Sequence, residues 1–162
     1  MKKTLFAAAV FFQVLLLALI PLKKISALLH GTEILLSTVQ IDPYDVLRGY
    51  YVTMNYEVAN RAAPKGTVFT VLDVDSGGIA RASSVVTEKP RGKLFIAGTS
   101  NGFMIDHGIG RYYIPETRTK EINKALVDVR GDTDAVLGIA KVDADGTPAL
   151  IGIRIGKKEY RF

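Results

Sequence analysis

Residues Tyr50–Val58 read YYVTMNYEV and carry the clearest strand pattern in the chain. Val52, Met54, Tyr56 and Val58 share the parity of Tyr50, whereas polar residues fill most of the alternate positions. A period of two residues is typical of a β-strand with one buried and one solvated face. The stretch therefore predicts a strand whose apolar face belongs to a core.

Similar β-like runs, separated by turn residues, occur on both sides of this stretch. They are Glu33–Ile41, Thr67–Val74, Ile79–Thr87, Lys93–Ala97, Phe103–Ile105, Ala135–Val142 and Ala149–Ile155. Asp75–Gly78 and Asp143–Pro148 hold the Asp and Gly residues that favour tight turns, so each predicts a hairpin. One short helix is expected at about Thr117–Leu126, where Ile122, Ala125 and Leu126 fall at helical spacing.

Residues Leu5–Leu22, LFAAAVFFQVLLLALIPL, form an uncharged apolar run. As a helix this run would measure about 27 Å, close to the roughly 30 Å of a bilayer core. A lysine pair follows it instead of a cleavage site with small residues, so we favour an uncleaved signal-anchor over a cleaved signal peptide. Lys2, Lys3 and the amino terminus outweigh Lys23 and Lys24 by a narrow margin, which favours a cytoplasmic amino terminus and an extracytoplasmic remainder.

These segments divide the chain into an anchor over residues 1–24, a juxtamembrane linker over 25–32 and a soluble β-rich domain over 33–162. A domain of about 130 residues can bury one modest core. The predicted fold class is mainly β. It comprises an N-terminal transmembrane helix followed by an antiparallel β-sandwich or partly closed β-barrel with one short helix.

The charge composition argues against a nucleic-acid partner. The chain has 21 basic and 16 acidic residues, a formal net charge of +5, but four of the lysines flank the apolar run. Residues 25–162 therefore hold 17 basic and 16 acidic residues, which leaves a net charge of only +1.

The chain has no cysteine and only two histidines, which excludes thiolate metal sites, so we expect no metal and no cofactor.

Two blocks carry the most specific motifs. The first, IDPYDVLRGYYVTMNYEV over Ile41–Val58, resembles the GDYxxLxY family of bacterial membrane-anchored proteins of unknown function. Gly49, Tyr51 and Tyr56 occupy the Gly and the two Tyr positions of that motif, and Met54 replaces its Leu. The second block, GIGRYYIPE over residues 108–116, is similar to a later Arg-aromatic-Tyr-hydrophobic-Pro-Glu segment of the family. The resemblance implies membrane attachment and brings no established activity.

The first block departs from the family at Tyr50, which stands where the motif has Asp. On the strand alternation, an acid at this position would lie near the inner face and would need a partner, which Arg48 could supply. With tyrosine here that ion pair is lost. Any activity that required the acid should be absent from this chain.

The two blocks supply a candidate interaction or ligand patch, because Tyr and Arg are favoured anchors at interfaces. Its members are Arg48, Gly49, Tyr51, Tyr56, Arg111, Tyr112, Tyr113 and Glu116. The alternative is that the first block is a core strand and that Arg111 and Glu116 form a surface ion pair worth little. The sequence leaves both interpretations open.

No catalytic residue is assigned, and we lean toward a protein that is not an enzyme. Asp106 and His107 are adjacent on a strand and so point to opposite faces, and Asp143-x-Asp145-Gly146 lacks the remaining ligands of a calcium loop. The leading hypothesis is a non-catalytic, membrane-anchored extracytoplasmic β domain that acts as an accessory or interaction subunit beside an integral membrane protein.

Two alternatives remain. One is a membrane-bound hydrolase, loosely similar to signal-peptidase-type serine–lysine proteases, with Lys141 as the candidate base. The other is a small-ligand binding module with a pocket lined by Tyr51, Tyr112 or Tyr113.

Overall fold

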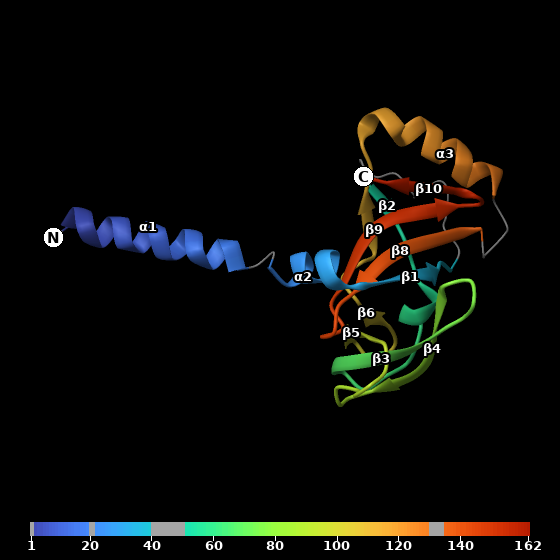
Figure 1. Cartoon of the computed structure of the whole chain (residues 1–162), viewed down its shortest axis with the longest axis horizontal. Helices are drawn as coiled ribbons and strands as arrows, with labels where there is room; N and C mark the ends of the chain where they lie inside the picture. The colour runs from blue at the N-terminus through green and yellow to red at the C-terminus, as the bar shows by residue number, and fades with distance from the viewer. Residues whose placement is uncertain (1, 20–21, 40–50, 130–134) are drawn as a thin grey trace.

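The computed structural model describes residues 2–19, 22–39, 51–129 and 135–162, and strands dominate it beyond residue 31. The helical elements are α1 (Lys2–Leu19), α2 (Leu22–His30), η1 (Glu57–Ala59), η2 (Glu116–Arg118) and α3 (Thr119–Asp128), η1 and η2 being single 3-10 turns (Figure 1). The strands are β1 (Thr32–Ser37), β2 (Tyr51–Thr53), β3 (Gly66–Val74), β4 (Ile79–Val86), β5 (Phe95–Ser100), β6 (Ile105–Asp106), β7 (Arg111–Tyr113), β8 (Val136–Val142), β9 (Pro148–Ile155) and β10 (Lys158–Arg161).

Eight of these strands form one curled sheet in the order β10-β9-β8-β1-β4-β3-β5-β6. Neighbouring strands are antiparallel except β1 and β4, which run parallel with Leu35 opposite Ile79. The turn between β8 and β9 reaches β5, where the Ala97 N–H donates to the Gly146 carbonyl oxygen at 2.8 Å. The sheet is therefore a half-barrel, closer to the partly closed barrel than to the sandwich that the sequence left open.

The two predicted hairpins are confirmed, and their turns use the residues that predicted them. Asp75 Oδ1 accepts hydrogen bonds from the backbone N–H groups of Gly77 and Ile79 at 2.8 and 3.0 Å. Asp143 Oδ1 accepts from Asp145 and Thr147 in the same way, at 3.0 and 2.8 Å. Such side-chain contacts are typical of Asx turns, so the Asp143 segment is a structural turn.

The alternating pattern of Tyr50–Val58 is present in the structure from Val52 onward, although most of the predicted strand is not. Val52, Met54, Tyr56 and Val58 are all buried, whereas Thr53, Asn55 and Glu57 are exposed. The strand predicted over Tyr50–Val58 nevertheless ends at Thr53, because the chain bends into η1 at Glu57. Inward packing of every second side chain therefore continues beyond the strand.

β2 pairs with β7 in a separate two-stranded sheet, here called the β2–β7 ribbon. Val52 and Tyr112 of the ribbon, Ile122 and Leu126 of α3, and Ile153 of β9 belong to one hydrophobic cluster. The predicted helix is confirmed with a shift of two residues at each end. The exposed side of α3 contacts the sheet through Glu121, which forms an ion pair with Lys158 at the start of β10. The ribbon and α3 thus complete the core of the half-barrel.

The N-terminal run expected as one helix over Leu5–Leu22 instead falls in α1, which ends at Leu19, and α2, which begins at Leu22. Proline disfavours helical backbone in the residue before it, and Pro21 stands between the two helices in the sequence. Within the described ranges, no helix combines the length and the apolarity needed to cross a membrane.

Residues 25–30, expected as part of a linker, lie in α2, which packs on β8 and β9. The Ala27 side chain is fully buried there, and this packing gives the segment a helical structure that its short length alone would not maintain.

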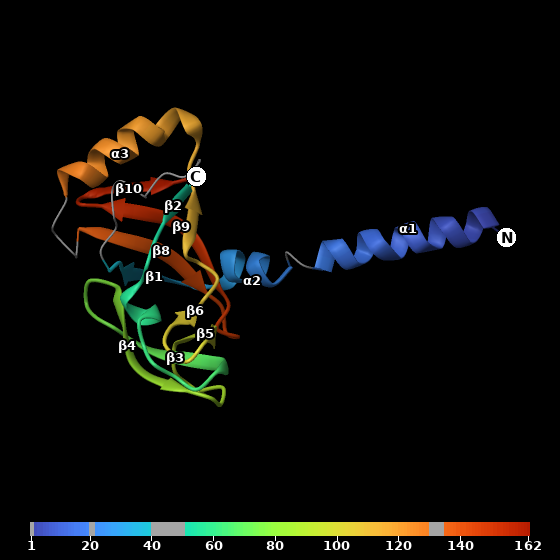
Figure 2. The same cartoon turned by 180° about the vertical axis from the view of Figure 1, so that it is seen from behind.

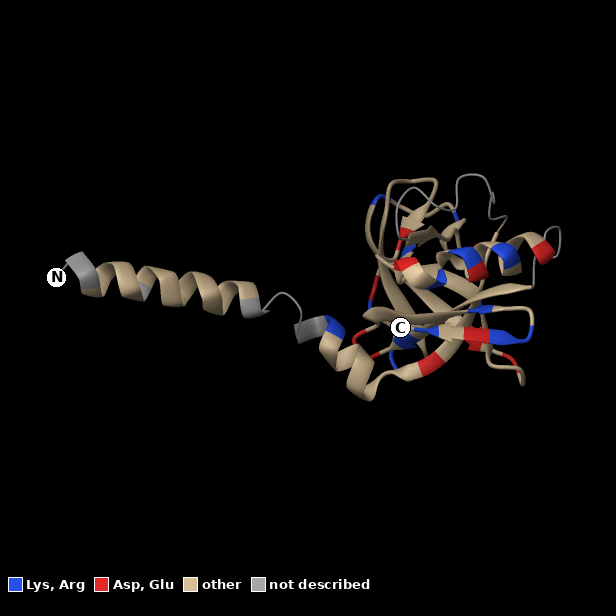
Figure 3. Ribbon diagram, turned by 90° about the horizontal axis from the view of Figure 1, so that it is seen from above, with Lys and Arg blue, Asp and Glu red and all other residues tan. Residues whose placement is uncertain are grey.

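α1 extends away from the strands in both views of the chain (Figures 1 and 2). Every described side chain of α1 is exposed, including Phe6, Phe11 and Leu17. In Figure 3, the blue and red segments that mark basic and acidic residues lie on the strands, on α3 and near the start of α2. The part of α1 that is not grey has no such segment. The mainly β fold class is confirmed, and α1 stands apart from the core that the strands enclose.

Candidate functional site

The two motif blocks meet in the β2–β7 ribbon. Tyr51 lies opposite Tyr113, Val52 opposite Tyr112, and Thr53 opposite Arg111. The Met54 N–H continues the contact by donating to the Gly110 carbonyl oxygen at 2.9 Å. Segments that are about sixty residues apart in the chain therefore act as one structural unit.

The outer face of the ribbon carries an aromatic–arginine patch, defined as Tyr51, Arg111 and Tyr113. The Tyr51 and Tyr113 ring centroids are 5.7 Å apart, and the Arg111 guanidinium lies over the Tyr51 ring, 5.6 Å from its centroid. Tyr113 is 67% exposed, and the Arg111 side chain is exposed too. This is a cation–π arrangement with one aromatic face and one guanidinium left accessible.

Tyr56, at the second tyrosine position of the motif, faces inward and fills space beneath β8. It is 2% exposed, and its hydroxyl donates to the Ile109 carbonyl oxygen at 3.2 Å. A side chain on Gly138 would meet the Tyr56 ring and hydroxyl at 2.6–2.7 Å, so Gly138 leaves room for this tyrosine. Burial raises the pKa of the Tyr56 phenol far above its ordinary value. Tyr56 is therefore a core residue, held in its neutral form.

Tyr112 also faces inward and holds the C-terminus. Its hydroxyl lies 3.3 Å from the Tyr160 carbonyl oxygen and accepts a hydrogen bond from the Phe162 N–H at 3.0 Å. Its ring stacks on that of Phe162 with centroids 6.1 Å apart. Burial raises the pKa of the Tyr112 phenol, and the Phe162 N–H opposes this increase. Tyr112 thus links the ribbon to β10.

Among the described residues, Glu116 does not join Tyr51, Arg111 and Tyr113. Glu116 is exposed at the start of η2, and the described contacts include no ion pair between it and Arg111. Arg48, Gly49 and the substituted position Tyr50 lie outside the described residues. Of the eight predicted residues, the structure brings three together on one surface and places Tyr56 and Tyr112 in the core.

A cavity of about 420 Å³ opens beside the ribbon. Met54, Tyr56, Met104, Ile105 and Ile109 supply its apolar lining, with Asn55, Thr99, Asn101 and His107 among its polar residues. Tyr51, Tyr112 and Tyr113, the pocket residues expected from the sequence, do not line it. The motif blocks instead contribute Met54, Asn55, Tyr56, Ile109 and Gly110. The sequence held no clear signal for this, because the cavity lies between two segments that are distant in the chain, residues 54–59 and 99–110.

His107 lies at this cavity with its side chain buried. Its Nδ1 is 3.1 Å from the Ala97 carbonyl oxygen. Burial lowers the pKa of His107, although the nearby carbonyl groups of Ala97 and Val58 and the Asp106 carboxylate oppose the shift. Asp106 Oδ1 accepts from the Gly108 N–H at 2.7 Å, so this carboxylate shapes a turn.

Lys141, the candidate base of a hydrolase, forms a structural contact with α2. Its Nζ donates to the Leu28 carbonyl oxygen of α2 at 2.9 Å. An ammonium group in this position caps the last turn of the helix, where carbonyl groups lack helical partners.

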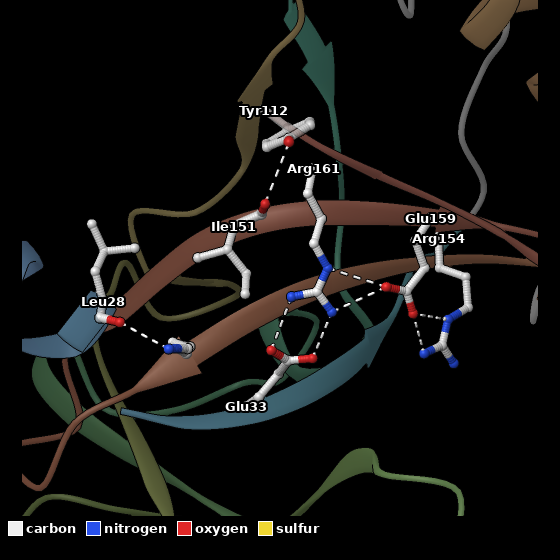
Figure 4. A network of polar contacts seen from close by, with 8 residues as sticks. Leu28, Glu33, Tyr112, Ile151, Arg154, Glu159 and Arg161 are labelled. Atoms are coloured by element: carbon white, nitrogen blue, oxygen red, sulfur yellow. Dashed lines mark hydrogen bonds and ion pairs between the residues drawn. The ribbon is translucent and has the colours of Figure 1, made fainter. Parts of the chain in front are cut away.

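A network of charged side chains, which the sequence did not predict, crosses the sheet near the C-terminus (Figure 4). Arg161 forms a bidentate contact with Glu33 at 2.7 and 3.0 Å and also binds Glu159, which pairs with Arg154. Arg161 lowers the pKa of the Glu33 carboxyl, chiefly by donating hydrogen bonds to it. A side chain at Gly152 would come within 2.8 Å of the Tyr160 carbonyl oxygen and within 3.0 Å of Arg161 Cγ, so this glycine leaves space for the backbone of β10 and for Arg161 as it crosses β9.

Comparisons with known proteins bear on the family alone. No curated protein and no solved structure matches the chain. The sequence does match the family described as GDYXXLXY protein over residues 13–153, which includes both motif blocks and most of the 162-residue chain. The ribbon is thus built from the segments that carried the resemblance, and the chain belongs to the GDYXXLXY family.

Proposed function

We propose that this protein is a non-catalytic accessory subunit, anchored in the cell membrane through its N-terminal segment. Its β domain would lie on the extracytoplasmic side and bind an integral membrane protein through the aromatic–arginine patch. The observation that carries the proposal is the convergence of Tyr51, Arg111 and Tyr113, from two distant blocks, on one exposed surface.

The chemistry of the patch suits protein recognition. Tyrosine and arginine are enriched among the residues that contribute most to binding at interfaces. Each offers a large flat surface with hydrogen-bonding groups at its end. The cation–π contact between Arg111 and Tyr51 also restrains both side chains before a partner arrives, which lowers the entropy cost of binding.

The N-terminal segment supports membrane attachment. The helix α1, Lys2–Leu19, has 18 residues and therefore measures about 27 Å. The apolar side chains described in α1 are exposed and need an apolar environment that the β domain does not supply. Insertion into lipid would remove this apolar surface from water, and the lysines that flank the apolar run Leu5–Leu22 would remain at the headgroups.

The partner is tested by isolating the full chain from native membranes in mild detergent after crosslinking. We expect a reproducible integral membrane companion, and Tyr113→Ala or Arg111→Ala should reduce its recovery about tenfold, equivalent to about 1.4 kcal/mol. Phe103→Ala is the matched control, since Phe103 is 83% exposed but lies outside the patch. Recovery as a lone species, or equal losses for Tyr113→Ala and Phe103→Ala, would contradict the proposal.

Attachment and orientation are tested separately. The chain has no cysteine, so Phe103→Cys introduces a single exposed thiol on the β domain. We expect alkaline carbonate to leave the protein in the membrane fraction and a membrane-impermeant maleimide to label Phe103→Cys in intact cells. Release by carbonate would contradict a membrane anchor, and labelling only after lysis would place the domain in the cytoplasm.

The cavity supports a second candidate function, the binding of a small uncharged ligand. Its volume of about 420 Å³ falls within the range of small-molecule sites. Several of its polar groups already have partners in the protein. The Tyr56 hydroxyl donates to Ile109, and Asn101 Oδ1 accepts from two backbone N–H groups. A mainly apolar molecule suits such a lining.

The methionines provide a probe for this binding, because Met54 and Met104 line the cavity and the only other methionine is Met1. Titration with 1-hexanol should shift the methyl NMR signals of Met54 and Met104 and leave that of Met1 unchanged. Ala59→Leu, which places bulk at the cavity, should abolish the shifts, whereas Ala62→Leu at an exposed position should not. Identical titrations for both variants would contradict binding there.

A further inference from the structure

The helix α2 presents an apolar face that the protein does not cover. Ile25, Leu28 and Leu29 lie three and four residues apart, which places them on one side of a helix. All three are exposed, with Leu29 at 69%. Ala27 points the opposite way and is fully buried against the β domain. α2 therefore has one face for the domain and one apolar face turned outward.

α2 is fixed to the β domain. Lys141 Nζ of β8 donates to the Leu28 carbonyl oxygen at 2.9 Å, and the Gly31 N–H donates to the Ala27 carbonyl oxygen at 2.9 Å. A side chain on Gly31 would collide with the Ala27 carbonyl oxygen and approach the Val142 backbone nitrogen within 3.0 Å, so the junction between α2 and β1 is tightly packed. Whatever covers the outer face of α2 therefore also sets the orientation of the β domain.

We infer that this outer face lies in the boundary between the headgroups and acyl chains of the bilayer, with Ile25, Leu28 and Leu29 inserted. The inference rests on the proposed membrane attachment and adds a second contact to it. An amphipathic helix of this kind buries its apolar face about 5–10 Å into the boundary between headgroups and acyl chains. The β8–β9 side of the domain, which holds α2, then faces the membrane.

Two observations favour lipid over a protein partner at this face. α2 begins three residues after α1 ends, so the exposed apolar surfaces of the two helices follow one another along the chain. Lys24 is exposed and lies next to Ile25, where its amine can reach anionic headgroups while its methylene groups lie along the apolar surface. Continuity with the anchor and a basic flank are both expected of a helix at a membrane surface.

The test uses single-cysteine variants of the full chain, reconstituted in vesicles of phosphatidylcholine with phosphatidylglycerol as the minor component. An environment-sensitive fluorophore is attached at Leu29→Cys, at Leu15→Cys in α1, and at Val127→Cys in α3, which is 56% exposed and serves as the control. Quenching is measured with lipids that carry a nitroxide either on the headgroup or deep in the acyl chain.

We expect the Leu29→Cys probe to lose most of its fluorescence with the headgroup nitroxide and little with the deep one. The Leu15→Cys probe should show the reverse, and the Val127→Cys probe should respond to neither. If Leu15→Cys is quenched but Leu29→Cys behaves like Val127→Cys, the inference fails while the anchor stands. Deep quenching at Leu29→Cys would also overturn it. Absence of quenching at Leu15→Cys would overturn the anchor itself.

Discussion

At the scale of single residues, two glycines matter because of the side chains that use their space. Gly138 in β8 leaves room for the Tyr56 ring, and Gly152 in β9 leaves room for the Tyr160 carbonyl oxygen and the aliphatic part of Arg161. Neither position needs an unusual backbone angle, so their importance is steric. Core packing is dense enough that one added carbon at such a site must displace its neighbour.

Gly138→Ala should lower the free energy of unfolding by about 1–3 kcal/mol, because the added methyl overlaps the Tyr56 ring and hydroxyl. The measurement is urea unfolding of the full chain in mild detergent, followed by tyrosine fluorescence. Gly110→Ala is the control, since an added methyl there comes no closer than 3.6 Å to another group. Equal midpoints for the two variants would contradict the steric role of Gly138.

His107 should make stability depend on pH. Burial lowers the pKa of the folded imidazole below its ordinary 6.5, so on acidification the unfolded chain binds a proton first. The free energy of unfolding should therefore fall as the pH drops below about 6.5 and level off below the folded pKa. Urea titrations across this range should show a flatter dependence for His107→Gln. His30→Gln, at an exposed position, should retain the wild-type slope.

At the scale of elements, the β2–β7 ribbon joins parts that the sheet alone would leave separate. Its inner side chains enter the main hydrophobic cluster, and Tyr112 binds the end of β10 through its hydroxyl. Its outer side chains form the aromatic–arginine patch. The ribbon therefore has one face in the core and one exposed face, so mutations on the two sides should have different effects on stability.

Tyr112→Phe should destabilise the protein by about 1 kcal/mol, because it removes the hydroxyl that connects the ribbon to Tyr160 and Phe162. Hydrogen exchange should accelerate at the β10 amides in particular. Tyr113→Phe makes the same chemical change on the exposed face and should leave both quantities unchanged. Faster exchange in β10 for both variants would argue against a specific role of Tyr112.

At the scale of the whole molecule, α1 and the β domain are almost independent, and α2 connects them. The half-barrel completes its own core with the ribbon and α3, whereas the described side chains of α1 remain exposed. α2 contributes the buried Ala27 and the carbonyl group that Lys141 binds. Stability should therefore depend on α2 and not on α1.

Deletion of residues 1–19 should change the free energy of unfolding of the β domain by less than about 0.5 kcal/mol, as expected for removal of exposed residues. Deletion of residues 1–30 removes α2 as well and should lower the urea midpoint, because Ala27 no longer covers β8 and β9. A loss of stability already present in the shorter deletion would show that α1 packs against the domain.

The sequence by itself determined the features that depend on near neighbours. These are the alternation after Tyr50, the two Asp–Gly hairpins, the short helix near Ile122, the charge-free N-terminal run and the family blocks. Side-chain periodicity and turn preferences act over a few residues, so they can be read without knowledge of the fold.

Only the tertiary structure decided which distant segments meet. The pairing of Tyr51 with Tyr113, the parallel contact of β1 with β4 and the passage of Arg161 over Gly152 to Glu33 all join residues far apart in the chain. The short strands β7 and β10 were not predicted as strands. Strand pairing depends on the packing of all partners at once, which no local pattern encodes.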